Sequence, residues 1–319
     1  MVDFIAIDFE TANHRLDSAC EMGIAVVEDM QVSKVFCSYI NPQGMEFDPS
    51  CIKVHGITPE MVADAPTFAE AWEKIGFLFS PHVPVLAHNA HFDMSVLKLS
   101  APEAPENLMY VDSMDIAKTL VEGSRSLAHC TECLNISLDD HHDAGCDAAA
   151  AAEIALCGMR DLGCLTMWEF LHFAPWVKMH FLRDLTPQKT LSKHRKSDRV
   201  PKGSEFYHWK ERKKCSDIVP TVDCVNSSSP FCGKNVVLTG ELSISRNDAM
   251  QKIVNAGGTL KSSVSRYTDY LIVGKQDVNI VGVDGMSCKE ERAQELNESG
   301  KAKIKVIGEA EFWKLLENS

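Results

Sequence analysis

Carboxylate side chains gather at three places in the first half of the sequence. Asp8 and Glu10 lie in the segment IAIDFETA, Asp93 follows the apolar segment VPVLAHN, and Asp147 directly precedes a run of five alanines. The alternation of a strand would put Asp8 and Glu10 on one face, where neighbouring carboxylates are costly unless a cation pairs with them. Together the four side chains supply hard oxygen ligands of the kind that Mg²⁺ and Mn²⁺ prefer.

Each of these positions also has an ordinary structural explanation. Asp8 and Glu10 fit an exposed strand end, and Asp93 fits the N-cap of a helix. The segment HHDAGCDAAA is harder to explain, because Asp143 and Asp147 are four residues apart and their like charges would repel on one helix face. A cation between these groups is one answer.

Alternating strand and helix signals surround the carboxylates. The segments DFIAIDFE, EMGIAVVED and KVFCSYI predict a meander of three strands, and VPVLAHN and NLMYVDSM predict two further strands. Helices are predicted for PTFAEAWEKIGFLF, HFDMSVLKL, SLAHCTECL, and from Ala144 into GMRDLG. The fold class is therefore α/β, with a mixed sheet that is flanked by helices.

Composition excludes several classes of protein. The chain has 319 residues, 45% of them hydrophobic and 24% charged, which suits about two globular domains. No positively charged leader and no long apolar run is present, so neither a signal peptide nor a membrane span is expected. The 12 cysteines are interpreted as reduced thiols of a cytoplasmic protein. Cys130 and Cys133 have the spacing of zinc ligands, but Cys130 fits the apolar side of a helix better, together with Leu127, Leu134 and Ile136.

Charge divides the chain into three parts. Residues 1–179 carry 27 acidic and 9 basic residues, a net charge of −18, whereas residues 180–214 have a net charge of +7 and residues 215–319 of −2. The middle contains Pro187, Pro201 and Gly203, which indicates a linker or weakly ordered arm over residues 166–228. It is either a solvated spacer or an arm that contacts phosphates, with Tyr207 and Trp209 available to stack on bases.

The segments AIDFETA, HNAHFD and HDAGCDA resemble, in order and spacing, the three motifs of the DEDDh 3′→5′ exonucleases, and VHGIT resembles a segment between the first two. This resemblance covers residues 1–161 and implies an RNase H-like fold. It assigns two divalent metal ions, Mg²⁺ or Mn²⁺, to Asp8, Glu10, Asp93 and Asp147. Such ions activate a water and stabilise the leaving 3′ oxygen.

The same resemblance selects the general base. It implies His142, five residues before Asp147, as the group that accepts the proton of the attacking water. His141 falls outside the pattern and is expected to be a solvated loop residue, and Asp143 is not counted as a ligand. Thr11 and Asn89 are candidates for positioning the terminal nucleotide, although each could equally satisfy local backbone groups.

From about Phe231 the sequence resembles a BRCT domain, a small α/β unit with a parallel sheet. GKNVVLTGEL matches its first strand, TDYLIVGK its third and FWKLL its closing helix. In BRCT domains that bind phosphate, a Thr/Ser-Gly pair and a lysine that opens a later helix form the pocket. Thr239, Gly240 and Lys289 are the corresponding candidates.

These observations predict an exonuclease domain over residues 1–165, a basic linker or arm over 166–228 and a BRCT domain over 229–319. The expected activity is metal-dependent release of nucleotides from 3′ ends of single-stranded or frayed DNA, in replication or repair. The BRCT domain would dock on DNA ends or on a protein such as a DNA polymerase, with no role for a membrane. The alternatives are a 3′-end exoribonuclease and a non-catalytic scaffold that binds nucleic acid.

Overall fold

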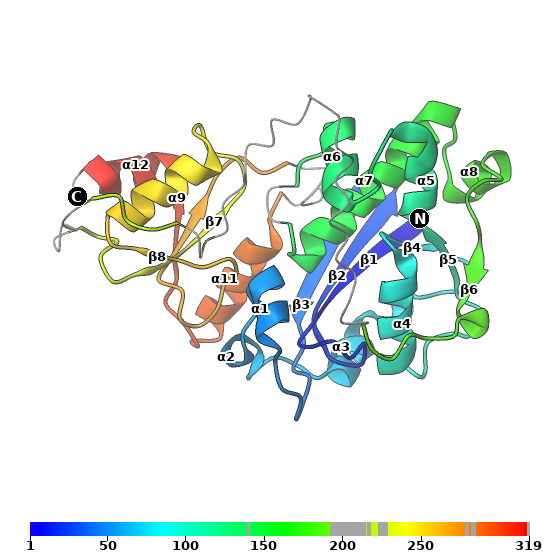
Figure 1. Cartoon of the computed structure of the whole chain (residues 1–319), viewed down its shortest axis with the longest axis horizontal. Helices are drawn as coiled ribbons and strands as arrows, with labels where there is room; N and C mark the ends of the chain where they lie inside the picture. Colours follow the sequence, from blue (N-terminus) through cyan, green and yellow to red (C-terminus); the bar gives the residue numbers. More distant parts are fainter. Residues whose placement is uncertain are drawn as a thin grey trace.

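The computed structural model describes residues 1–138, 141–191, 215, 218–222, 229–277, 281 and 285–317. These residues form two domains, each with its own sheet and its own hydrophobic core (Figure 1). No helix among the described residues is long and apolar enough to cross a membrane.

The first domain is built on a mixed sheet of six strands in the order β3-β2-β1-β4-β5-β6. Its strands are β1 Phe4–Thr11, β2 Ala19–Glu28, β3 Gln31–Tyr39, β4 Val85–Ala87, β5 Met109–Asp112 and β6 His180–Phe181. The first three strands are antiparallel neighbours, whereas β4 and β5 run parallel to β1. The predicted meander and the mixed sheet are confirmed, in the arrangement expected of an RNase H-like fold.

Helices cover both faces of this sheet. They are α1 Pro49–His55, α2 Pro59–Val62, α3 Phe68–Ile75, α4 Ala90–Ser100, α5 Ser113–Leu120, α6 Leu127–Leu134, α7 Ala144–Leu162 and α8 Met167–Phe173, with short 3₁₀ turns at Gly76–Leu78 and Leu182–Asp184. All four predicted helices are present. NLMYVDSM ends as a strand at Asp112, earlier than expected, because the Asp112 side chain accepts from the backbone N–H of Met114 and starts α5.

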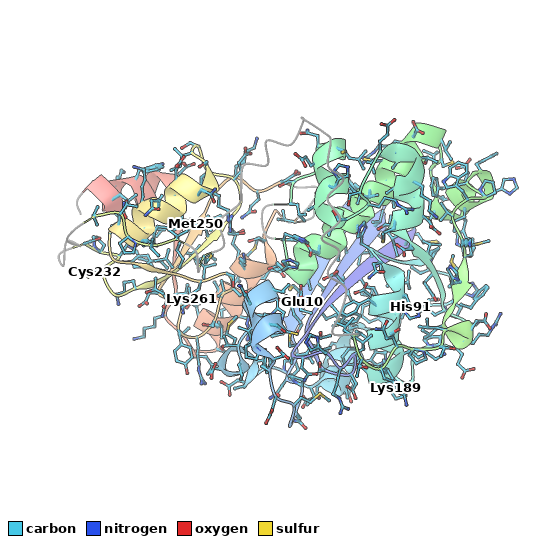
Figure 2. The ribbon with its side chains drawn as sticks, in the orientation of Figure 1. Glu10, His91, Lys189, Cys232, Met250 and Lys261 are labelled. Carbon is cyan, nitrogen blue, oxygen red and sulfur yellow. The ribbon has the colours of Figure 1, made fainter. Side chains whose placement is uncertain are left out.

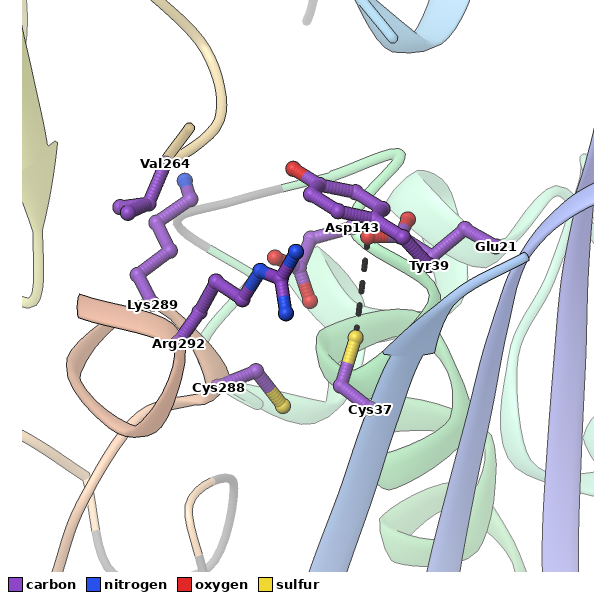
Figure 3. A pocket seen from close by; sticks show the side chains of 8 residues that line it. All are labelled: Glu21, Cys37, Tyr39, Asp143, Val264, Cys288, Lys289 and Arg292. Atoms are coloured by element: carbon purple, nitrogen blue, oxygen red, sulfur yellow. Dashed lines mark hydrogen bonds between the residues drawn. The ribbon is translucent and has the colours of Figure 1, made fainter. Parts of the chain in front are cut away.

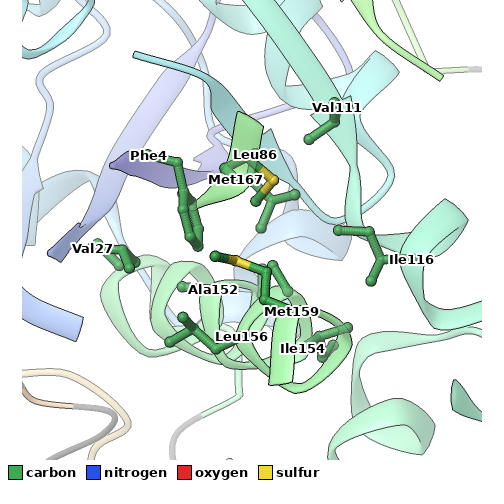
Figure 4. Packing of buried hydrophobic residues seen from close by; sticks show 14 of the residues in the cluster. Phe4, Val27, Leu86, Val111, Ile116, Ala152, Ile154, Leu156, Met159 and Met167 are labelled. Carbon is green, nitrogen blue, oxygen red and sulfur yellow. The ribbon is translucent and has the colours of Figure 1, made fainter. Parts of the chain in front are cut away.

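Helix α7 is the central packing element of the first domain. Its alanine run is buried, and with Ile154, Leu156 and Met159 it lies against Phe4 and Leu86 of the sheet (Figure 4). Helix and sheet approach closely at the start of α7. A Cβ added at Gly23 would lie 1.9 Å from the carbonyl oxygen of Ala144, so only glycine fits on β2 at this point.

The second domain has a four-stranded parallel sheet in the order β10-β9-β7-β8. Its strands are β7 Asn235–Thr239, β8 Thr259–Leu260, β9 Tyr270–Val273 and β10 Lys305–Gly308, and its helices include α9 Arg246–Asn255, α11 Cys288–Glu298 and α12 Glu309–Glu317. The predicted small α/β domain with a parallel sheet is confirmed. Strand β10 had no counterpart in the sequence-based prediction.

The predicted boundary at residue 165 is wrong, because the chain remains part of the first domain at least as far as Leu191. Helix α8 packs on α7, β6 adds an edge strand beside β5, and Leu182 and Leu185 are buried in the core. This segment packs on the first domain because apolar side chains, such as Leu182 and Leu185, recur between its basic residues. Most of the remaining predicted linker, including Tyr207 and Trp209, lies outside the described residues.

We expect Leu182→Ala to lower the free energy of unfolding by about 2–4 kcal/mol, because it removes a fully enclosed side chain from the core. Met179→Ala is the matched control, since Met179 lies in the same segment and is 52% exposed. Chemical denaturation of both variants measures the difference. If Leu182→Ala lowered the free energy of unfolding no more than Met179→Ala does, residues 166–191 would not belong to the folded domain.

Candidate active site

The central strand β1 presents two acidic side chains at its carboxyl end. Asp8 and Glu10 are half-buried and alternate with the buried residues Ile7, Phe9 and Thr11. The register places Asp8 opposite Gly23 and Glu10 opposite Glu21 on β2. Glu10 therefore lies toward the end of the sheet that faces the second domain (Figure 2).

Asp93 reaches the same place from the first turn of α4. Only 1% of its surface is exposed, and its Oδ1 accepts from the backbone N–H of Phe9 at 3.1 Å. The N-cap of α4 is Asn89, so the N-cap explanation for Asp93 is wrong. Asn89 has the left-handed φ of 67°, and its backbone N–H donates to Asp112 at 3.0 Å.

Asp147 comes from the first turn of α7 and is 4% exposed. The helix begins at Asp143, whose side chain accepts from the backbone N–H of Cys146 as an N-cap. The structure brings carboxylate oxygens of Asp8, Glu10 and Asp147 within 4.8 Å of one another. Asp93 is not in this tight group, but its charge acts on Asp8.

Burial and like charge both oppose ionisation of this cluster. Burial, followed by the charges of Asp93, Asp147 and Glu10, raises the pKa of Asp8 well above its usual value. Burial and then the Asp147 charge raise the pKa of Glu10 to about 8. Burial also raises the pKa of Asp93. A divalent cation would remove this penalty, and oxygen ligands from three elements suit Mg²⁺ or Mn²⁺.

Both histidines of the loop before α7 contact the cluster. The His142 ring lies with Nδ1 3.6 Å from Glu10 Oε1, and its backbone N–H donates to Asp147 at 3.1 Å. His142 has a φ of 71°, which is uncommon for a non-glycine residue. His141 is exposed, as expected, but its Nδ1 lies 2.9 Å from Asp147, a contact that the sequence did not predict. The two rings stack at 3.9 Å.

Thr11 lies just beyond the carboxylates and is held by a residue that sequence reasoning did not assign. His55 ends α1, and its Nε2 lies 3.2 Å from the carbonyl oxygen of Thr11. The backbone N–H of Ile57 donates to His55 Nδ1, so Nε2 carries the proton and donates to Thr11. Burial lowers the pKa of His55 to about 4, which keeps the ring neutral. The segment VHGIT contains the signal that could have identified this role.

The candidate phosphate pocket of the second domain lies near the contact between the domains. Thr239 is 2% exposed and its hydroxyl donates to Ser287 at 3.1 Å, while Gly240 follows with a φ of 73°. Lys289, at the start of α11, is 6% exposed and lines a cavity that it shares with residues of the first domain. The three residues are thus near one helix start, in a buried setting.

The pKa of Glu10 generates a prediction about stability. The pKa of this carboxyl is about 8 in the folded protein and 4.5 in the unfolded chain. Its ionisation therefore lowers the stability of the fold as the pH rises above 4.5, and has no effect well below that pH. In chelator, we therefore expect Glu10→Gln to exceed the wild type in stability by on the order of 1–3 kcal/mol at about pH 8 and to match it at about pH 4, below both pKa values.

Thermal unfolding at both pH values, with and without Mg²⁺, measures this effect. Added Mg²⁺ should stabilise the wild type more than Glu10→Gln, because the variant lacks one charged ligand. Glu73→Gln, at an exposed position of α3, is the control and should leave stability unchanged at either pH. Equal stability of Glu10→Gln and wild type at about pH 8 would contradict the proposed charge penalty.

Two family models match this chain. Residues 5–155 match the Exonuclease family model (RNase_T), and residues 226–316 match the model of the BRCA1 C Terminus (BRCT) domain. The chain is 31% identical over 160 residues to a DNA polymerase III PolC-type protein of Caldanaerobacter subterraneus, and 30% identical to that of Thermotoga petrophila. These matches cover 48% of this chain and only 11% and 12% of the relatives' length.

Two of the similar solved structures each match about half of this chain. Exonuclease X in complex with 5′ overhanging duplex DNA is 24% identical, with a TM-score of 0.42 over 54% of this chain and 98% of that one. An E. coli ExoI-ssDNA complex is 19% identical, with a TM-score of 0.45 over 53% of this chain and 43% of that one. The family models place an exonuclease-family domain over residues 5–155 and a BRCT domain over residues 226–316 of this protein.

Proposed function

We propose that the first domain is a metal-dependent 3′→5′ exonuclease that removes nucleotides from the 3′ ends of DNA. The observation that carries this proposal is the convergence of carboxylates from β1, α4 and α7, beside a loop with two histidines. Structural needs do not explain such a cluster, because its members are buried or half-buried and repel one another. A metal-dependent phosphodiester hydrolase uses such a concentration of hard oxygen ligands to hold its ions.

Asp8, Glu10, Asp93 and Asp147 would hold two divalent ions, Mg²⁺ or Mn²⁺. Such a pair supplies an activated water and charge stabilisation for the leaving 3′ oxygen. The protein supplies the rigid frame: β1 fixes Asp8 and Glu10, and the hydrogen bond from Phe9 holds Asp93 against that strand. Asp147 is set by the first turn of α7, which Asp143 caps.

His142 would act as the general base. Its ring lies beside Glu10 on a loop of exposed and half-buried residues, where it can accept a proton from a water and pass it to solvent. In this proposal, His141 holds Asp147 through its Nδ1 and does not take the proton from the attacking water. Thr11, at the end of β1, and Asn89, at the N-cap of α4, would position the terminal nucleotide.

The proposal favours DNA over RNA because the curated relatives are described as DNA polymerase III proteins. The BRCT domain would dock the enzyme on DNA ends or on a replication or repair protein, such as a polymerase. Thr239, Gly240 and Lys289 remain candidates for its phosphate contacts.

Oligonucleotides that are labelled at either end test the activity directly. Full-length protein should release mononucleotides from the 3′ end of single-stranded DNA in Mg²⁺ or Mn²⁺, and chelator should stop the release. RNA of the same sequence is the parallel substrate, and faster cutting of RNA would make the protein an exoribonuclease. Loss of label from the 5′ end first would overturn the polarity.

We expect Asp8→Ala and Asp147→Ala each to lower nucleotide release by more than about a hundredfold while the protein stays folded, because each removes a metal ligand from a repulsive cluster. Asp161→Ala is the control, since Asp161 is exposed on the same helix as Asp147. The readouts are initial rates and circular dichroism. Undiminished release by folded Asp8→Ala would refute the ligand assignment.

Substitution of His142 and substitution of His141 should have different effects on kcat and on metal binding. His142→Ala should reduce kcat by about 10²–10⁴-fold without changing Mn²⁺ affinity, which is the effect of losing a general base. His141→Ala should weaken Mn²⁺ binding modestly, because its ring orients Asp147, and should reduce kcat less. Steady-state rates and Mn²⁺ titrations distinguish the two roles. If His141→Ala lowered kcat more, the general base would be His141.

A further inference from the structure

The two domains contact each other through β3 and the start of α11. The guanidinium group of Arg292 lies over the ring of Tyr39 at 5.3 Å, and Arg266 pairs with Asp64 at 2.7 Å. Tyr39 also hydrogen-bonds through its side chain to Ser263 of the second domain. Contacts of three kinds thus hold this face of the BRCT domain against the exonuclease domain.

A small cavity of about 20 Å³ lies within this contact. That volume suits one water or one ion. The side chains that line it come from both domains: Glu21, Cys37, Tyr39 and Asp143 from the first, and Val264, Cys288, Lys289 and Arg292 from the second (Figure 3). The cavity therefore combines two thiols, two carboxylates and two basic groups.

Donor atoms of three side chains converge at this cavity. The sulfur atoms of Cys37 and Cys288 and a carboxylate oxygen of Asp143 all lie within 4.8 Å of one another. Figure 3 shows Cys288, at the first turn of α11, with its sulfur directed toward the Cys37 side chain on β3. A fourth donor is adjacent, because Cys37 Sγ lies 3.7 Å from Glu21 Oε1.

A glycine provides the room for this convergence. A Cβ added at Gly145 would lie 2.4 Å from Cys288 Sγ and 3.3 Å from the Cβ of Cys37. Any larger residue at position 145 would push the second domain away from the first turn of α7. Gly145 is thus matched to the approach of Cys288.

We propose that Cys37, Cys288 and Asp143 bind one Zn²⁺ ion between the domains, with Glu21 as the fourth ligand. Tetrahedral zinc with sulfur at about 2.3 Å and oxygen at about 2.0–2.2 Å separates its donor atoms by roughly 3.3–3.8 Å. That separation is compatible with the 4.8 Å within which the donor atoms of Cys37, Cys288 and Asp143 lie. Thiolates select zinc over the Mg²⁺ that suits the oxygen ligands of the nuclease centre.

The charge of the cavity is consistent with a bound cation. Two thiolates and two carboxylates carry four negative charges, which Zn²⁺ together with Lys289 and Arg292 would balance. Burial and the Asp143 charge raise the pKa of Glu21, and contact with Cys288 and then burial raise that of Cys37. The anionic forms are thus unfavourable until a cation is present. This site uses none of the four proposed nuclease ligands and would fasten the BRCT domain to the first domain.

Cobalt provides the test, because Co²⁺ replaces zinc and gives a sulfur-to-metal charge-transfer absorption that the sulfur-free nuclease centre lacks. Reduced full-length protein should develop this absorption with one equivalent of Co²⁺ and lose it when Zn²⁺ is added. Cys37→Ser and Cys288→Ser should each abolish it. Cys133→Ser is the control and should retain the absorption. Cys133 is exposed and lies 3.5 Å from His129, so it is another cysteine next to a possible metal ligand, but it is outside the proposed site.

A second measurement needs no substitution and so does not depend on the folding of variants. Zn²⁺ should protect Cys37 and Cys288 of the wild-type protein from alkylation, mapped by peptide mass spectrometry, while Cys133 stays reactive. Absence of the cobalt absorption, its loss in Cys133→Ser, or equal alkylation with and without Zn²⁺ would each overturn the zinc site. So would a Cys37–Cys288 disulfide whose reduction restores no zinc binding.

Discussion

The rest of the structure depends on one electrostatic constraint, which is the close approach of Asp8, Glu10 and Asp147 in a largely buried site with Asp93 beside them. In water these groups would be separately solvated and charged. Folding brings them together, and the result is raised pKa values for Asp8, Glu10 and Asp93. The central sheet and α7 must therefore be stable enough to hold an unfavourable cluster until a cation neutralises it.

Helix α7 meets this requirement and connects the two candidate metal sites. Its buried alanine run packs on β1 and β2, and the close approach at Gly23 fixes the helix start against the strand opposite Asp8. Asp147, in this first turn, belongs to the carboxylate cluster with Asp8 and Glu10, whereas Asp143, one turn earlier, lies at the cavity between the domains. A change at the domain contact would thus act on the same helix turn that carries a proposed nuclease ligand.

Local signals in the sequence were sufficient to predict most of the sheet, since period-two segments predicted β1 to β3. The close approach of Asp8, Glu10 and Asp147 was implied by the resemblance to the exonuclease motifs, and their role as metal ligands stays a prediction. Long-range packing was not accessible in the same way: Leu182 and Leu185 join the core from a segment whose basic charge suggested a linker. The contact between His141 and Asp147 depends on the turn of one loop, and the meeting of Cys37 with Cys288 depends on domain docking, which no local pattern encodes.

Proton release on Mg²⁺ binding tests the central claim most directly. Calorimetric titration of the wild-type protein at about pH 7, in buffers of different ionisation enthalpy, counts the protons that leave as the ion binds. Because the pKa of Glu10 is about 8 without metal, we predict net release of protons, and a smaller release from Glu10→Gln. Mg²⁺ binding with no proton release would contradict the account, since it would mean that the carboxylates were already fully ionised in the metal-free protein.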